Sequence, residues 1–545
     1  MKHPNSQWLA LTSAVCASAV PLQSCKSQAE AKLQKPYNIV YIMTDDHTAQ
    51  MMSCYDTRYI QTPNLDRIAN DGVRFTQSFV ANSISGPSRA CLLTGKHSHM
   101  NGFTNNEHSI FDGSQQTFPK LLQKAGYETA VIGKWHLHTL PTGFDHWEIL
   151  PGQGDYYNPA FIQMTGDTVK QNGYVTNLIT DKSIEWLENR PNKNKPFCLL
   201  IHHKAIHRNW LPDLKYIREY EDKTFPIPNT FWDNYNGRPA AAAQQMSIAK
   251  DMDIVYDTKM LKPDTNTPLK NTYLAMISRL TPEERSRYDA FYDSLAADFY
   301  GSLAADFYGR SLTDKELAEF KYQRYMRDYA KVVKSLDDGV GKVLDYLKNN
   351  GYLENTLVVY TSDQGFYMGE HGWFDKRFMY EESMSTPLIM LLPNGLQRRG
   401  DIPDMVQNID HAPTFLDLAG VDIPNDIQGI SYLPLLVGKE SPKQPLRNAL
   451  YYHYYEFPAE HMVKRHYGVR TNRYKLMHFY NDIDVWELYD LEKDPNETNN
   501  IYGQPGTEKL TQELLTELIR LEKQYQDEVA LKLTLPVAQA AGVAQ

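Results

Sequence analysis

Two buried-strand patterns that end in carboxylates constrain the fold of this 545-residue chain more than any other feature. The run over residues 37–43 is followed by Asp45 and Asp46, and the run over residues 356–360 is followed by Asp363. Continuous apolar runs of this length are typical of parallel strands that are buried on both faces. Because open α/β sheets have their active sites at the carboxyl ends of the strands, these carboxylates mark a candidate site.

Strand and helix patterns alternate along the rest of the first 450 residues. Thr62 is placed to cap a helix with Pro63 at its first position, and Gly351 directly follows a long amphipathic stretch. This order predicts an α/β fold with a mostly parallel sheet and helices on both faces. The predicted helices are 63–72, 119–125, 180–189, 327–350 and 413–420, the last with Asp410 as a candidate cap, and further predicted strands are 128–132 and 196–202.

Two parts of the chain depart from this alternation. Residues 210–320 have no strand signal, so we expect a helical insertion there, within a catalytic domain over residues 37–447. After that domain the pattern changes to short strands and a terminal helix over residues 507–527. This change predicts a smaller α+β C-terminal subdomain over residues 448–545.

The first 24 residues have the layout of a secretion signal. Lys2 and His3 precede an apolar stretch over residues 8–20, which is too short for a membrane-spanning helix of ~20 residues. The tetrapeptide Leu-Gln-Ser-Cys that ends at Cys25 resembles a bacterial lipobox, with ordinary cleavage nearby as the alternative. We therefore expect export to the periplasm or cell surface, a possible lipid anchor at Cys25, and a linker over residues 25–36.

The formal net charge of -10 limits the kinds of partner. A surface with this excess of carboxylates repels nucleic acid and other long polyanions, so no nucleic-acid partner is expected. If the substrate is anionic, the positive charge that binds it has to be local.

The strongest local signal is Ser-Gly-Pro-Ser-Arg from Ser85 to Arg89, followed by Thr94 and Gly95. A bare Ser-x-Pro-x-Arg occurs by chance in many proteins, as a serine loop that enters a helix. With the Thr-Gly extension and the acidic clusters, the segment resembles the maturation signature of type I, formylglycine-dependent sulfatases of the serine type. The likeness runs from about residue 37 to the end of the chain and implies an alkaline-phosphatase-like fold.

The resemblance implies two cofactors. Ser85 would be oxidised to formylglycine (3-oxoalanine) by a serine-type sulfatase maturation enzyme. A calcium ion would be held by Asp45, Asp46, Asp363 and Gln364 together with the residue at position 85. Hard oxygen ligands of this kind suit Ca²⁺ better than Zn²⁺.

The resemblance also implies a mechanism. One hydroxyl of the hydrated formylglycine attacks sulfur while Ca²⁺, Lys134 and Lys376 hold the sulfate oxygens. His207 then protonates the departing sugar oxygen. His136 takes a proton from the second hydroxyl, which expels sulfate, and Arg89 steadies the formylglycine. Alone, each histidine or lysine would more often be a structural or solvated residue.

The segments around His207 and Lys376 look closest to bacterial N-acetylglucosamine-6-O-sulfatases. This implies a 6-O-sulfated N-acetylglucosamine in heparan-type or host glycans as substrate. Asp375 and Arg377 resemble contacts to sugar hydroxyls, and His466 or His478 could add another. For each of these the alternative is a surface ion pair or a core histidine.

Other functions stay open at this point. A phosphatase or phosphodiesterase of the same superfamily would keep an unoxidised nucleophile and often two metals, and a sulfatase for another sugar position has the same signature. A glycan-binding relative without activity and a structural lipoprotein are further alternatives. Two departures bear on activity: Ile206 stands where many sulfatases have proline, and Ser385 stands where arginine is common.

Overall fold

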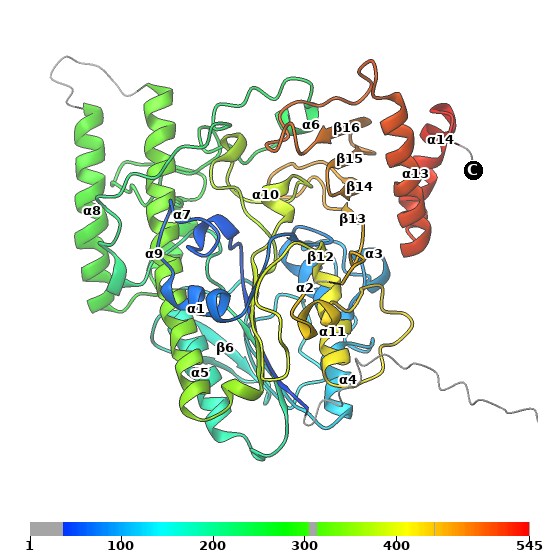
Figure 1. Cartoon of the computed structure of the whole chain (residues 1–545). Coiled ribbons are helices and arrows are strands. Elements are labelled where there is room, and N and C mark those ends of the chain that lie inside the picture. Colours follow the sequence, from blue (N-terminus) through cyan, green and yellow to red (C-terminus); the bar gives the residue numbers. More distant parts are fainter. Residues whose placement is uncertain (1–35, 305–312, 441, 544–545) are drawn as a thin grey trace, which may run out of the picture. The chain divides into compact units, whose positions relative to one another are not determined.

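The computed structural model describes residues 36–304, 313–440 and 442–543. The predicted signal peptide, Cys25 and all of the predicted linker except residue 36 therefore lie outside the described residues. Two sheets organise the described chain: a ten-stranded sheet in the order β11-β2-β10-β9-β1-β8-β4-β5-β6-β7 and a four-stranded sheet in the order β13-β14-β15-β16 (Figure 1). A two-stranded pair, β12-β3, lies outside both.

The strands are β1 (Asn38–Thr44), β2 (Val73–Phe75), β3 (Ser78–Phe79), β4 (Glu128–Lys134), β5 (His146–Leu150), β6 (Ala160–Gln163), β7 (Thr168–Lys170), β8 (Phe197–His202), β9 (Thr356–Ser362), β10 (Leu388–Leu391), β11 (Gly400–Ile402), β12 (Val406–Gln407), β13 (Ala449–Tyr454), β14 (His466–Thr471), β15 (Tyr474–Phe479) and β16 (Val485–Asp490).

The α-helices are α1 (Pro63–Asp71), α2 (Ser85–Thr94), α3 (Ser98–Asn101), α4 (Phe118–Lys124), α5 (Val175–Asn189), α6 (Pro239–Ala242), α7 (Lys270–Ile277), α8 (Pro282–Ala304), α9 (Asp314–Asn349), α10 (Glu381–Met384), α11 (His411–Leu418), α12 (Leu433–Val437), α13 (Glu508–Tyr525) and α14 (Glu528–Ala540). Short 3-10 turns are η1 (Ala49–Met51), η2 (Leu214–Tyr216), η3 (Leu353–Asn355), η4 (Glu370–Gly372) and η5 (Asn408–Asp410).

The large sheet is mostly parallel: its antiparallel pairs involve β10 on one side of the centre and β6 on the other, and β11 pairs in parallel with β2 at one edge. β1 pairs in parallel with β8 and β9, and β4 pairs in parallel with β8 and β5, whereas β10, β6 and β7 run antiparallel to their neighbours. The register sets Thr44 of β1 opposite Ser362 of β9. The two predicted carboxylate clusters therefore leave the sheet side by side, and the predicted α/β fold class is confirmed.

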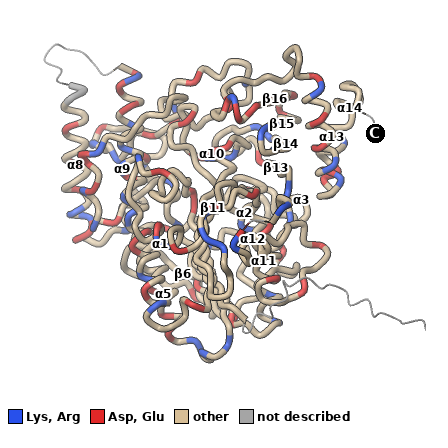
Figure 2. The backbone as a smooth tube through the Cα atoms, viewed as in Figure 1, with Lys and Arg blue, Asp and Glu red and all other residues tan. Residues whose placement is uncertain are grey.

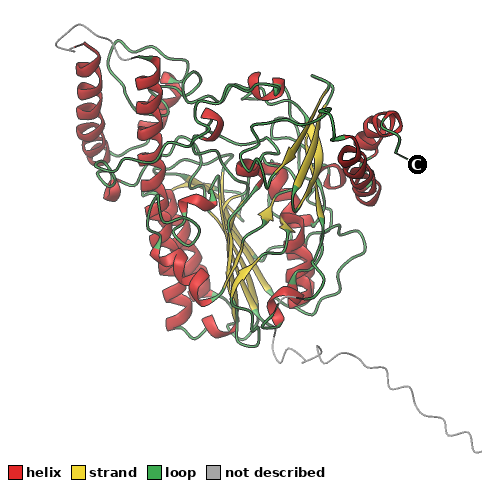
Figure 3. Cartoon of the chain, turned by 45° about the horizontal axis from the view of Figure 1, so that its top comes forward, coloured by secondary structure: helices red, strands yellow, loops and turns green. Residues whose placement is uncertain are grey.

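Both faces of the sheet are covered by helices, as Figure 3 shows. Alternate residues of β1 enter different cores: Val40 and Ile42 pack with α1, α5 and α9, while Ile39 and Tyr41 pack with α2, α4 and α11. This explains why the strand is a continuous apolar run, since neither set of side chains faces water. Full burial of one such side chain stabilises the fold by about 1.5–3 kcal/mol.

The segment that connects β8 to β9 is long and contains α6 to α9 but, among its described residues, no strand. Much of it before α7 is turn and loop, so the predicted insertion is less helical than expected. α9 begins at Asp314, earlier than predicted, because Thr313 and Glu316 form a capping box there. Figure 2 shows acidic and basic positions interspersed along α8 and α9.

The smaller C-terminal unit packs α13 and α14 against its antiparallel sheet through a separate apolar cluster. The predicted terminal helix matches α13, and α14 was not predicted. Tyr452 of β13 joins this sheet to two loops of the larger domain: its hydroxyl donates to the Arg377 carbonyl at 2.6 Å and accepts from Ser83 N at 3.1 Å. Among the described helices, none combines the length and apolarity needed to cross a membrane.

Candidate active site

Ser85 is the first residue of α2, at the carboxyl-end edge of the sheet. Its hydroxyl donates to Asp45 Oδ1 at 3.2 Å. All ten residues of α2 are buried, and Ser85 itself is 1% exposed. The helix ends at Gly95, whose φ of 66° is the left-handed conformation that terminates helices. The Thr-Gly pair of the sequence signature is thus the end of the helix that Ser85 begins.

The predicted metal ligands form one buried cluster. Asp46 N donates to Asp363 Oδ1 at 3.3 Å, and Gln364 Nε2 donates to Asp46 Oδ1 at 2.5 Å. Asp45, Asp46 and His207 each offer a ligand atom, all within 4.8 Å of one another. The Gln364 Oε1 atom is buried and has no hydrogen-bond partner among the described residues. A cluster rich in carboxylate and amide oxygens, with one oxygen unused, fits a hard cation.

Each carboxylate of the cluster has its own buried cation. The Lys134 ammonium contacts Asp45, Lys376 Nζ lies 2.8 Å from Asp46, and Arg89 donates from Nε and Nη2 to Asp363 Oδ2 at 3.1 and 2.8 Å. Arg89 also donates to the Lys134 carbonyl at 2.9 Å. The net charge of the whole chain is negative, but here three cations meet at one point. These cations balance the three carboxylates, so a divalent cation bound to the cluster would give the local positive charge that the sequence required.

Gly133 explains how Lys134 reaches this cluster. Its φ is 109°, and a Cβ at this position would lie 2.0 Å from the His202 carbonyl oxygen on β8. Any larger residue would push β4 away from β8 and move the ammonium.

Several other residues of the site have left-handed backbone conformations. φ is 63° at Asp46, 55° at His136, 81° at Asp375 and 93° at Arg377. For non-glycine residues such conformations cost about 1–3 kcal/mol each and persist only where the surrounding structure fixes them. Four such residues lie around one cluster. The surrounding structure therefore holds their side chains in place although the backbone there is strained.

Burial and charge set the protonation of the cluster. Burial would raise the pKa of Asp45, but Lys134, His207 and Arg89 hold it well below the ordinary range. Burial raises the pKa of Asp46 to about 6 in spite of Lys376. Burial, together with Lys134 and Arg89, lowers the pKa of His136 to about 2.

His207 is oriented by its own backbone. Its Nδ1 lies 2.7 Å from the Arg208 carbonyl and donates to it, so Nε2 is the nitrogen left for chemistry. Burial lowers its pKa well below the ordinary value, and the negative charge of a bound ester would favour the protonated form. A cavity of about 360 Å³ opens beside it, with Gln153, Lys204 and Tyr256 among its lining residues.

The predicted sugar contacts have different outcomes. Asp375 and Arg377 lie on either side of Lys376 and contact each other. His466 is fully buried: its Nδ1 donates to the Lys464 carbonyl at 2.7 Å and its Nε2 accepts from Met379 N at 2.9 Å. Because both ring nitrogens are used by the backbone, His466 cannot contact a sugar, and this assignment was wrong.

His478 is also unsuited to a sugar contact, since it pairs with Asp484 at 2.8 Å and stacks on Trp486 within the C-terminal sheet. The two departures from the family pattern leave the cluster intact. Ile206 is fully buried, and Ser385 ends α10, where it bridges to Phe79.

The structure adds residues that the sequence did not indicate. His461 Nε2 lies 3.3 Å from Asp375 Oδ2, and Arg208 pairs with Asp257 at 2.8 Å and with Glu460 at 3.2 Å. Only Arg208 had a signal, namely its position next to His207. Glu460 and His461 come from the loop between β13 and β14, whose approach depends on the packing of the two sheets.

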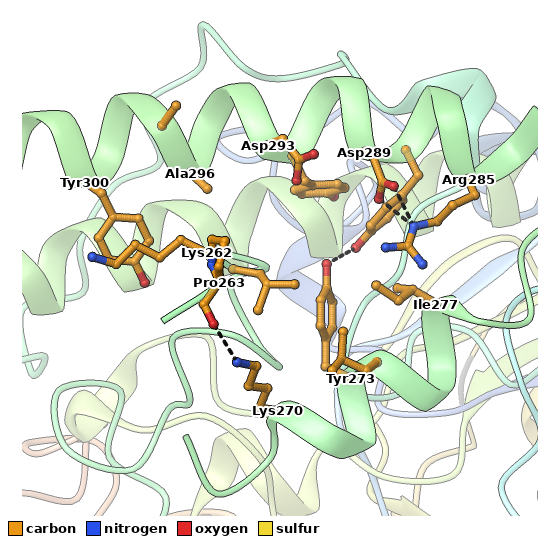
Figure 4. A pocket seen from close by; sticks show the side chains of 15 residues that line it. Lys262, Pro263, Lys270, Tyr273, Ile277, Arg285, Asp289, Asp293, Ala296 and Tyr300 are labelled. Carbon is orange, nitrogen blue, oxygen red and sulfur yellow. Dashed lines mark hydrogen bonds and ion pairs between the residues drawn. The ribbon is translucent and has the colours of Figure 1, made fainter. Parts of the chain in front are cut away.

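A second cavity, of about 590 Å³, lies between α7 and α8 (Figure 4). Tyr273 and Tyr288 share a hydrogen bond of 2.9 Å in its wall, and Arg285 pairs with Asp289. None of its lining residues belongs to the cluster around Ser85.

Comparison with known proteins agrees with this geometry. A model of the sulfatase family matches residues 37–421, and a model described as N-sulphoglucosamine sulphohydrolase, C-terminal, matches residues 369–524. The N-acetylglucosamine-6-O-sulfatase of Bacteroides thetaiotaomicron is 49% identical over 515 residues, which cover 94% of this chain and 90% of that protein.

Solved structures show the same relationship. One, determined in complex with its substrate D-glucosamine-2-N,6-O-disulfate, has a TM-score of 0.84 and 50% identity, covering 91% of this chain and 99% of that chain. A phosphonate monoester hydrolase from Silicibacter pomeroyi has a TM-score of 0.64 at 19% identity, covering 90% of this chain and 96% of that chain, and shares the fold alone. Since a family model covers most of its length and a relative of high identity spans nearly all of it, the chain belongs to the sulfatase family and is a sulfuric ester hydrolase.

Proposed function

We propose that this enzyme hydrolyses the 6-O-sulfate of N-acetylglucosamine in heparan-type or host glycans, with a formylglycine derived from Ser85 as its reactive group. The observation that carries the proposal is the position of the Ser85 hydroxyl, 3.2 Å from Asp45 and within a cluster of three buried cations. The similarity to an N-acetylglucosamine-6-O-sulfatase supports the choice of substrate.

Two groups would complete the site. Asp45, Asp46, Asp363 and Gln364 would hold Ca²⁺ next to position 85, and the free Gln364 Oε1 supports this assignment. When present, the ion would add positive charge beside the sulfate, and the oxidised residue would supply two hydroxyls on one carbon for attack and release.

Buried lysine and arginine side chains would stabilise the negative charge of the sulfate ester. Lys134 and Lys376 are fully or almost fully buried, so their charge acts through little water and favours an anionic ester and the charge that develops during transfer. Arg89 holds Asp363 and the Lys134 carbonyl together, which fixes the cluster before substrate binds.

Proton transfer is assigned to the two histidines. His207 Nε2 would donate a proton to the departing sugar oxygen, since its Nδ1 is committed to the Arg208 carbonyl. His136, whose Nδ1 is buried without a partner among the described residues, would accept a proton from the residue at position 85. Burial beside Lys134 and Arg89 keeps this imidazole neutral, so one ring nitrogen has a lone pair free for the proton. Asp375 and Arg377 would bind sugar hydroxyls.

Mass spectrometry of position 85 in protein from its native host, paired with sulfate release from 6-O-sulfated N-acetylglucosamine, tests this proposal. A loss of two hydrogens at Ser85 together with release is the expected result. Conversion without release would reject the substrate. An unmodified Ser85 in active protein, with phosphate released from a phosphate ester instead, would replace the sulfatase mechanism by a phosphohydrolase mechanism.

For location, we propose export by the N-terminal signal and a lipid anchor at Cys25, to the periplasm or the cell surface. The support is the sequence alone, because these residues lie outside the described part of the chain. Labelled fatty acid should be incorporated into the wild-type protein and not into Cys25→Ala. Equal labelling of both would reject the anchor.

A further inference from the structure

A carboxylate lies across two arginines beside the active site and has no part in the proposed mechanism. Glu460, on the loop between β13 and β14, has a side chain that is 65% exposed. Its Oε1 accepts from Arg208 Nη1 at 3.2 Å, and its Oε2 lies 3.9 Å from Arg377 Nη2. Each arginine directly follows a residue of the proposed catalytic set, His207 or Lys376. The three side chains therefore lie where the site meets solvent.

Buried carboxylates hold both arginines in place. Arg208 donates to Asp257 from Nε and Nη2, each at 2.8 Å, and Asp257 is fully buried. This bidentate pair fixes the guanidinium plane and leaves Nη1 for another anion. Arg377 contacts Asp375 through Nη1, and its Nε is buried without a partner among the described residues. Each arginine thus has one terminal nitrogen that faces the exposed Glu460 carboxylate, Nη1 in Arg208 and Nη2 in Arg377.

This contrast determines which anion can be replaced. Glu460 is the exposed partner of these pairs, so water can solvate its carboxylate after separation, whereas the two buried guanidinium groups would still need an anion. A guanidinium that is already fixed in plane binds a carboxylate or sulfate group with little loss of side-chain freedom. An incoming oxyanion can therefore displace Glu460 and leave the pair between Arg208 and Asp257 undisturbed.

We infer that Arg208 Nη1 and Arg377 Nη2 form a second anion subsite, closed by Glu460 in the free protein, which takes an oxyanion of the substrate other than the sulfate that is removed. The inference rests on the proposed function, because it assigns this group to the same sugar substrate. The chemistry fits an N-sulfate on the same sugar or the carboxylate of a neighbouring uronate.

The test compares three substrates with wild-type protein and Glu460→Gln. They are 6-O-sulfated N-acetylglucosamine, glucosamine with N- and 6-O-sulfates, and a disaccharide of 6-O-sulfated N-acetylglucosamine and a uronate. Removal of the competing carboxylate should raise kcat/KM for a doubly anionic substrate, relative to the singly sulfated one, about fivefold. The substrate whose relative kcat/KM rises identifies the source of the second anion.

Glu185→Gln is the matched control, since it removes one charge from an exposed glutamate of α5, outside the site. Its substrate ratios should equal those of the wild type. Unchanged ratios in Glu460→Gln, or an equal change for all three substrates, would overturn the inference.

A second measurement separates the subsite from the proposed function. Protein made without a maturation enzyme keeps Ser85 and should bind the three sugars without turnover, so calorimetry gives the ratios of their Kd values. A ratio that shifts in Glu460→Gln while no sulfate is released by converted protein would support the subsite and reject the proposed reaction. Unshifted ratios would reject the subsite whatever the activity.

Discussion

The charges of the same cluster act on His207 and His136, but the two histidines differ in their free nitrogens and therefore in what they can do. His207 has Nδ1 committed to the Arg208 carbonyl, so it can exchange a proton only through Nε2. His136 has a buried Nδ1 without a partner among the described residues. The assignment of one as acid and the other as base can be tested through the leaving group.

We predict that His207→Gln slows sulfate release from the sugar substrate by about 10²–10⁴-fold, the usual contribution of a general acid. An aryl sulfate should be affected much less, because a phenolate departs without full protonation. Steady-state rates on both substrates measure the difference. His108→Gln, at a histidine whose side chain is 84% exposed, is the control. An equal loss on both substrates would contradict the acid role.

At this scale, some of the site could be predicted from the sequence and some could not. Ser85 and Asp363 are marked by local patterns, a signature and a strand end, Lys134 was indicated by the resemblance to the family, and the structure brings the three together. His466 failed because a histidine's availability depends on its tertiary partners, here the backbone of Met379 and Lys464. Glu460 had no local signal for the same reason.

Pairs of helices carry two further features that sequence patterns do not show. Glu522 of α13 is fully buried, and its Oε1 accepts from the Thr534 hydroxyl of α14 at 2.6 Å. Its Oε2 has no partner among the described residues. Burial raises the pKa of Glu522 from 4.5 to about 8. The folded protein therefore binds this proton more tightly than the unfolded chain does.

From this shift we predict that stability falls as pH rises from about 4.5 to 8, by a few kcal/mol from this group alone. Glu522→Gln imitates the protonated form, so it should be more stable than wild type at about pH 8.5 and should flatten this part of the profile. Urea unfolding at several pH values measures it. Glu513→Gln, on the exposed side of α13, should leave the profile unchanged. If the unfolding free energy of Glu522→Gln changed with pH in the same way as that of the wild type, Glu522 would not be the group responsible.

α1 is capped by another helix. Asp337 of α9 accepts from Leu65 N at 2.9 Å and from Asn64 N at 3.1 Å, at the start of α1. We predict that Asp337→Ala lowers the free energy of unfolding by about 1–2 kcal/mol, since two helix N–H groups lose their acceptor. Asp345→Ala, which removes an exposed pair with Arg67, should cost less than about 1 kcal/mol. Equal effects in urea titrations would argue against the cap.

Helices and strands could be predicted from the sequence where their apolar pattern was continuous. β1 and β9 were found because both faces of each are buried. α14 was missed because Pro536 lies inside it and Gln526, with a φ of 62°, ends α13 just before it. The early start of α9 depends on a capping box that precedes its amphipathic stretch.

For the whole molecule, the proposed calcium ion would join β1 to β9, since Asp45 and Asp46 follow one strand and Asp363 and Gln364 the other. We predict that exhaustive treatment with EGTA lowers the unfolding temperature and reduces sulfate release at least about 100-fold, because the cluster loses its added positive charge. Readdition of Ca²⁺ should restore both. Full activity in protein shown by elemental analysis to lack metal would rule out the ion.

The complete burial of α2 has a consequence for when the protein can be matured. An enzyme that oxidises Ser85 must bind the residues around it, yet in the folded chain every residue of α2 is buried. We therefore expect oxidation before folding, and before export if the enzyme is cytoplasmic, so that the fraction of active molecules is decided once, during biosynthesis. A maturation enzyme should convert a peptide over residues 80–100 and leave the folded protein unconverted. Conversion of the folded protein at the same rate would show that α2 opens on its own.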